Sequence, residues 1–139
     1  PVTADITAEE LQIGGDMDMI VLPGGMPGTT NLYADKRVTS AVRAMYDAEK
    51  YVAAICAAPS VILGGMGLLK GRRATCYPGM EDGMEGAEAV PATCVTDGKI
   101  ITACGVGGAL DFACALITAL ISREKADEIA LSVVYHAAN

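Results

Sequence analysis

One cysteine in this 139-residue chain stands where a fold would expose a reactive side chain. Cys56 directly follows the apolar, β-compatible run Val52 to Ile55 and precedes two alanines and Pro59, which suits a first helical turn. This order predicts a nucleophile elbow, in which a sharp turn presents the side chain at the carboxyl edge of a sheet. The helix amino terminus would favour a thiolate there. We interpret Cys56 as a nucleophilic or redox-active thiolate; the alternative is a small buried hydrophobe.

A glycine-rich loop is the second candidate element. The strand expected over Met17 to Leu22 stops at the sequence PGG, and a loop rich in Gly, Pro and Thr is expected through Asn31. Ligands of parallel sheets collect beyond the carboxyl ends of the strands, so this loop and the Cys56 turn are expected to meet. The backbone N–H groups of the loop would then face a developing oxyanion opposite the thiolate. A plain tight turn is the alternative interpretation.

Further strands and helices must hold these two turns. Thr7 and Glu10 form a T-x-x-E capping box, which predicts a short helix from about residue 8 to residue 13. Asp35 is expected to cap a helix whose apolar residues recur at helical spacing, and Asp97-Gly98 predicts a hairpin turn. The other expected elements are a helix after Pro59 that stops near residue 64, strands at 73–76, 93–96 and 99–103, a loop or short exposed helix at 78–88, and helices at 109–121 and 123–134.

Alternating strands and helices predict one α/β domain over residues 1–139, a sandwich around a mainly parallel sheet. Hydrophobic residues make up 52% of the chain, which is enough to bury a real core in a single domain. Aromatic residues are only 4%, so the core is expected to be aliphatic.

Charge and composition exclude several function classes. The formal net charge of −7 argues against a nucleic-acid-binding surface. The apolar stretch Ala109 to Ile121 is too short to span a bilayer and contains Asp111, so no membrane partner is expected. No cofactor is implied either, because the chain has no P-loop and no GxGxxG after a strand.

The five cysteines are scattered without a CxxC pair, and His136 is the only histidine. A metal site is therefore not expected, since the ligand spacing is wrong and imidazole is nearly missing. An odd number of cysteines spread through apolar segments fits free thiols in a reducing cytoplasm.

Three motifs, in family order and spacing, resemble the DJ-1/ThiJ/PfpI superfamily. They are IVLPGG at Ile20 to Gly25, AAICAAP at Ala53 to Pro59, and TDGKIITACGVGGALDFACALI at Thr96 to Ile117. The similarity covers nearly the whole chain and is closest to the bacterial YajL/ThiJ-like branch. It implies a flavodoxin-like three-layer sandwich with a cysteine elbow, related to class I glutamine amidotransferases.

The resemblance also implies roles for individual residues. Cys56 matches the nucleophilic, oxidation-sensitive thiol of the family, and Gly25 and Ala57 stand where backbone N–H groups would form an oxyanion pocket. Gly24 and Tyr77 are candidates for binding the substrate; packing at the core or rim is the alternative for Tyr77.

Two features depart from the family pattern. Some members place a histidine near the cysteine, but Met84 to Ala89 contains none, which fits the YajL-like branch and removes a Cys–His dyad. His136 is expected to be a solvent-exposed residue of the tail. Family members also begin with a strand, a helix and a further strand, which carry a glutamate that shares a proton with the thiolate. We therefore expect this chain to be a fragment, or to be accompanied by a separate amino-terminal chain, and not to fold autonomously.

The resemblance leaves two main functions open. The first is an enzyme acting on α-oxoaldehydes or their protein adducts, glyoxalase- or deglycase-like, with small aldehydes or glycated proteins as substrates. The second is a redox-sensing or chaperone-like stress protein in which Cys56 is oxidised. An inactive paralogue, and a relative of the thiazole-phosphate-biosynthesis or protease-like proteins without that activity, are further alternatives. Similar proteins are usually homodimers.

Overall fold

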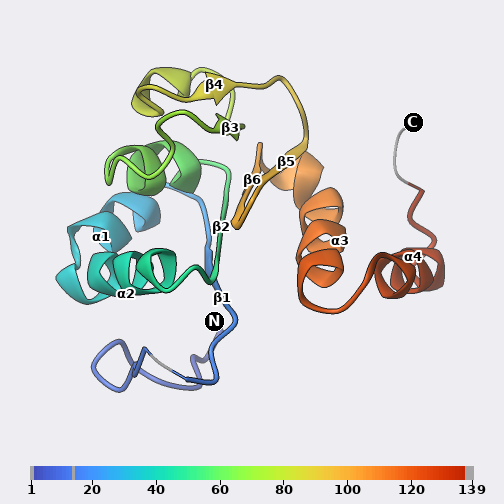
Figure 1. Ribbon diagram of the computed structural model, residues 1–139, viewed down its shortest axis with the longest axis horizontal. Helices are drawn as coiled ribbons and strands as arrows, with labels where there is room; N and C mark the ends of the chain where they lie inside the picture. The colour runs from blue at the N-terminus through green and yellow to red at the C-terminus, as the bar shows by residue number, and fades with distance from the viewer. Residues whose placement is uncertain (1, 14, 137–139) are drawn as a thin grey trace.

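Four strands form the main sheet of the computed structural model, which describes residues 2–13 and 15–136 (Figure 1). Their order is β1 (Met19–Leu22), β2 (Tyr51–Ile55), β6 (Ile100–Ala103) and β5 (Cys94–Asp97). The first three are parallel and β5 is antiparallel to β6, so the predicted mainly parallel sheet is confirmed. A small parallel sheet joins β3 (Arg73–Ala74) to β4 (Glu88–Ala89).

Helices cover both faces of the main sheet, as Figure 1 shows. One face carries α1 (Gly28–Ala34), α2 (Lys36–Asp47) and a π-helical segment, η1 (Pro59–Gly64). The other carries α3 (Ala109–Leu120), against which α4 (Arg123–Ser132) packs. Two short 3₁₀ turns, η2 (Glu81–Gly83) and η3 (Val106–Gly108), complete the described elements.

The core lies on either side of β2 and β6. Val52 and Ala54 pack in the cluster on the α2 side, whereas Ala53 packs with Ile101 and Phe112 on the α3 side. Strands buried on both faces read as continuous apolar runs, which is why VAAI could be recognised in the sequence. The result is the flavodoxin-like three-layer α/β sandwich that the resemblance implied.

Several local predictions are confirmed. The Asp35 side chain accepts a hydrogen bond of 2.9 Å from the Arg37 N–H and caps α2. The predicted hairpin forms, but its two-residue turn is Gly98 and Lys99, because Asp97 still pairs with Ile100 at the end of β5. Gly98 has the positive φ of 59° that suits such a turn. The last two helices begin at the predicted residues 109 and 123.

The helix predicted over residues 8–13 is wrong. One contact of the capping box does form: the Thr7 N–H donates to Glu10 Oε2 at 2.8 Å. This hydrogen bond lowers the pKa of the Glu10 carboxyl. The chain nevertheless makes a single turn there. A segment this short repays little of the cost of helix nucleation unless tertiary packing supports it.

The loop predicted through Asn31 is partly wrong as well, because residues 28–34 form α1. Tertiary contacts stabilise this short helix: Thr29 is fully buried, and the Tyr33 hydroxyl donates to the Gly65 carbonyl at 3.0 Å. The strand predicted at 73–76 is shorter than expected. It ends at Ala74 because the Thr75 N–H donates to the side-chain oxygen of Thr102 rather than to a strand carbonyl.

Candidate active site at Cys56

Cys56 occupies a sharp backbone turn at the carboxyl end of β2. Its φ of 65° lies in the left-handed region, which a residue with a side chain adopts only at a cost. Two hydrogen bonds hold this conformation: the Cys56 N–H donates to the Ala103 carbonyl at 2.9 Å, and the Cys56 carbonyl accepts from the Tyr77 N–H at 2.8 Å. Strain that the surroundings maintain is typical of functional positions. The thiol side chain is partly exposed.

Gly24 allows the backbone to approach the thiol closely, and Gly105 lies nearby. A Cβ atom built on Gly24 would lie 2.5 Å from the Cβ of Cys56 and 3.2 Å from its Sγ. A Cβ atom on Gly105 would lie 3.9 Å from the same Sγ. The loop after β1 and the loop after β6 therefore meet at the Cys56 turn, as the rule for carboxyl edges of parallel strands predicts.

The two predicted oxyanion donors lie at this turn. Gly25 follows Gly24 with a φ of 88°, and Ala57 follows Cys56. Among the hydrogen bonds of the described residues, none is donated by the N–H of Gly25 or Ala57. Both groups are thus candidates to donate to a ligand, and their roles stay predictions.

Tyr77 lies at the rim of the turn. Its side chain is 52% exposed, and its Cδ2 atom lies 3.6 Å from a Cβ built on Gly105. Its backbone N–H holds the Cys56 carbonyl. The structure therefore brings Gly24, Tyr77 and Cys56 together, and a role of Gly24 or Tyr77 in binding substrate stays a prediction.

Two other thiols, those of Cys76 and Cys94, lie in environments that oppose ionisation. Burial, followed by the charge of Glu81 and the neighbouring Cys56, raises the pKa of Cys76 to about 11. Burial and the Asp111 carboxylate raise the pKa of Cys94 to about 11. A thiolate at either position is therefore disfavoured near neutral pH.

Two residues at this site were missed by sequence reasoning. Gly105 follows β6, so the carboxyl-edge rule could have found it. Thr29 donates from both its N–H and its hydroxyl to the Gly25 carbonyl, each at 2.8 Å. It carried no signal, because the segment that contains it was interpreted as a loop.

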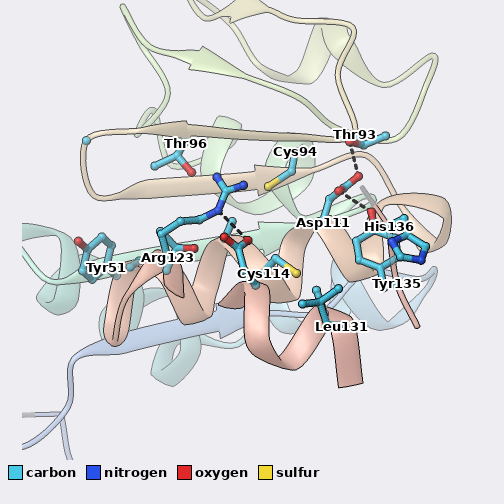
Figure 2. A pocket seen from close by; sticks show the side chains of 16 residues that line it. Tyr51, Thr93, Cys94, Thr96, Asp111, Cys114, Arg123, Leu131, Tyr135 and His136 are labelled. Carbon is cyan, nitrogen blue, oxygen red and sulfur yellow. Dashed lines mark hydrogen bonds and ion pairs between the residues drawn. The ribbon is translucent and has the colours of Figure 1, made fainter. Parts of the chain in front are cut away.

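A separate cleft of about 930 Å³ lies between the β5–β6 hairpin, α3 and α4 (Figure 2). Its polar groups bind one another: Asp111 accepts hydrogen bonds of 2.6 Å from Thr93 and from Tyr135, and Arg123 pairs with Asp127. The bond to Asp111 raises the pKa of Tyr135 to about 12. Cys56, Gly24, Gly25 and Tyr77 do not line this cleft.

We place the candidate active site at Cys56 rather than in the larger cleft. The Cys56 turn combines backbone strain, an accessible thiol and two N–H groups without a partner in the described structure, whereas the polar side chains of the cleft are engaged with each other. His136 is exposed and lines the cleft, which agrees with its expected place in the tail. Within residues 2–13 and 15–136, no group of three or more His, Cys, Asp or Glu side chains is arranged to hold a metal ion.

None of the described helices has the length and apolar character needed to cross a membrane.

Comparisons with known proteins agree with the fold. The family model described as DJ-1/PfpI matches residues 1–119. The chain is 40% identical over 120 residues to DJ-1 homolog A of Arabidopsis thaliana, covering 81% of this chain and 29% of that protein. It is 34% identical to a deglycase of Pyrococcus horikoshii, covering 73% of this chain and 60% of that protein. Thus the chain spans less than two thirds of the length of either relative.

A solved structure is also similar. A cysteine-to-alanine mutant of a DJ-1 superfamily protein from Salmonella typhimurium superposes with a TM-score of 0.92 and 34% sequence identity. The superposition covers 99% of this chain and 74% of that one.

Proposed function

Because this chain belongs to the DJ-1/PfpI family, we propose that it is a cysteine-dependent stress-response protein that acts on α-oxoaldehydes or on their protein adducts. The observation that carries the proposal is the left-handed Cys56 against Gly24, with the N–H groups of Gly25 and Ala57 free of partners in the described structure. The relative from Pyrococcus horikoshii, named a deglycase, supports this substrate class.

In the proposed reaction the Cys56 Sγ attacks the aldehyde carbon and forms a C–S bond. The carbonyl electron pair moves to oxygen, and the Gly25 and Ala57 N–H groups donate to the resulting oxyanion. Subsequent proton transfers require water or the glutamate that the resemblance implies. A Cys–His dyad takes no part, since Met84 to Ala89 contains no histidine.

The experiment is turnover of methylglyoxal by the complete protein, meaning this chain with any segment of the same protein that accompanies it. Cys56→Ala is expected to abolish turnover, because it removes the nucleophile. Cys114→Ala is the matched control, since that thiol lines the other cleft. Turnover that survives Cys56→Ala contradicts the mechanism.

A redox-sensing role is the second candidate, and the contrast between thiols favours it. Cys56 is partly exposed, whereas Cys76 is buried with a raised pKa, so mild peroxide is expected to oxidise Cys56 before Cys76. Peptide mass mapping after peroxide treatment checks this. Equal oxidation of all five cysteines argues against a sensor.

We also propose membership of the YajL-like branch, supported by the absence of a histidine near the cysteine. The strand–helix–strand segment of the family would pair with the free edge of β1, which has only β2 as a partner in the described structure. A homodimer would cover exposed apolar side chains such as Ile121 and Leu131. Free thiols at all five cysteines support a cytoplasmic location.

A further inference from the structure

Thr29 is a fully buried polar residue beside the candidate oxyanion loop. Its backbone N–H and its hydroxyl both donate to one oxygen, the carbonyl of Gly25, at 2.8 Å each. The N–H bond belongs to the first turn of α1 and already provides that carbonyl with a partner. The hydroxyl bond is therefore an addition that α1 does not need in order to begin.

The Gly24–Gly25 peptide, which carries the Gly25 N–H, lies between two anchors. On one side Gly24 lies against Cys56, with no room for a side chain. On the other side the Gly25 carbonyl is held by Thr29. Glycine has the widest backbone freedom of any residue, and Gly25, at a φ of 88°, would otherwise be free to reorient this peptide.

We propose that Thr29 is a positioning residue, whose hydroxyl fixes the orientation in which the Gly25 N–H meets the developing oxyanion. This inference rests on the proposed function of Cys56. Donors that are oriented before the reaction stabilise a transition state without reorganising when the charge develops. The competing explanation is purely local, because threonine hydroxyls in helices commonly bond to the carbonyl four residues earlier.

The test compares Thr29→Val, which removes the hydroxyl and keeps the branched shape, with Thr29→Ser, which keeps the hydroxyl. Thr75→Val is the matched control, because the buried Thr75 hydroxyl donates to the Ala92 carbonyl at 2.9 Å elsewhere in the fold. In the complete protein, Thr29→Val is expected to lower kcat for methylglyoxal about tenfold at unchanged KM. Thr29→Ser and Thr75→Val are expected to keep the wild-type kcat.

Alkylation of Cys56 by iodoacetamide distinguishes positioning from general damage. This displacement forms no oxyanion, so its rate is expected to be the same in Thr29→Val and wild type. The proposal is overturned if kcat of Thr29→Val stays within about twofold of wild type. It is also overturned if Thr29→Ser or Thr75→Val loses as much activity, or if alkylation slows in parallel with turnover.

A second readout applies if the wild-type protein shows no Cys56-dependent turnover. Amide hydrogen exchange of the peptide that spans residues 23–29 is expected to be faster in Thr29→Val than in wild type and normal in Thr29→Ser. That result keeps the positioning role and places the failure in the proposed function. Unchanged exchange overturns the positioning role itself.

Discussion

At the scale of single residues, the Cys56 turn depends on backbone that approaches closely from two loops. The αL conformation of Cys56 is maintained by one hydrogen bond to Ala103 and one from Tyr77. The backbone of Gly24 packs against Cys56, where there is no room for a side chain. Because several contacts together hold Cys56, its left-handed conformation persists although it costs of order 1 kcal/mol or more.

Gly24→Ala is expected to destroy this arrangement. The new Cβ would lie 2.5 Å from Cys56 Cβ and 2.8 Å from the Ile55 carbonyl oxygen, so the backbone must shift. We expect a loss of about 1–3 kcal/mol in stability and about a hundredfold in turnover. Thermal unfolding and methylglyoxal kinetics measure the two effects.

Gly28→Ala is the control, because a Cβ at that position meets nothing within 4 Å. It lies in the first turn of α1 and is expected to leave activity unchanged. Equal behaviour of Gly24→Ala and Gly28→Ala would refute the close approach at Cys56.

The raised pKa values of Cys76 and Cys94 predict a pH-dependent order of alkylation. The thiolate is the reactive form, and a pKa of about 11 leaves roughly one molecule in a thousand ionised at pH 8. Labelling of both thiols by iodoacetamide is therefore expected to rise steeply from pH 8 toward pH 11. Peptide mapping across that range checks it, and a plateau for either thiol below pH 9 would be inconsistent with these environments.

At the scale of elements, sequence patterns predicted the elements that carry strong local signals. The buried strand before Cys56, the Asp35 cap and the Asp97-Gly98 hairpin depend on residues adjacent in the chain, so they could be read from the sequence. The helix α1 could not be predicted from the sequence in this way. Its buried Thr29 and its Tyr33–Gly65 contact come from packing against distant residues.

The same distinction applies to the candidate site. Cys56 and the PGG turn could be identified from the residues next to them in the sequence. The role of Thr29 depends instead on α1, a helix that was not predicted from the sequence. The position of Cys56 against Gly24 joins two segments far apart in the chain, and only the parallel-sheet rule predicted that they would meet.

Asp35→Ala is expected to weaken the start of α2. The Asp35 carboxylate satisfies the Arg37 N–H, and an N-cap of this kind contributes about 1 kcal/mol. Amide exchange in the first turn of α2 is therefore expected to accelerate about fivefold. Asp35→Asn keeps a capping oxygen and serves as the control; equal acceleration in both variants would mean that the ion pair with Arg37, and not the cap, stabilises this end.

At the scale of the whole molecule, helices cover both faces of the main sheet, but β1 has no partner strand on its outer edge in the described structure. In the described structure β1 pairs only with β2, and Val21 is 46% exposed. An open apolar strand edge invites further pairing. We therefore predict that residues 1–139 alone unfold over a broad range of urea concentration rather than in one sharp transition.

Circular dichroism during a urea titration, with sedimentation to report the oligomeric state, measures this. A single cooperative transition of the monomeric chain, with the slope expected of a domain this size, would show that it folds autonomously.

The central claim is that the Cys56 thiolate attacks an aldehyde, and protection from alkylation tests it most directly. The complete protein is incubated with methylglyoxal at pH 7, treated briefly with iodoacetamide and mapped by peptide mass. We predict that methylglyoxal slows the labelling of Cys56 and leaves Cys114 unaffected, because the C–S bond occupies the Cys56 sulfur. Labelling of Cys56 at the same rate with and without methylglyoxal would contradict the account, as would equal protection of Cys114.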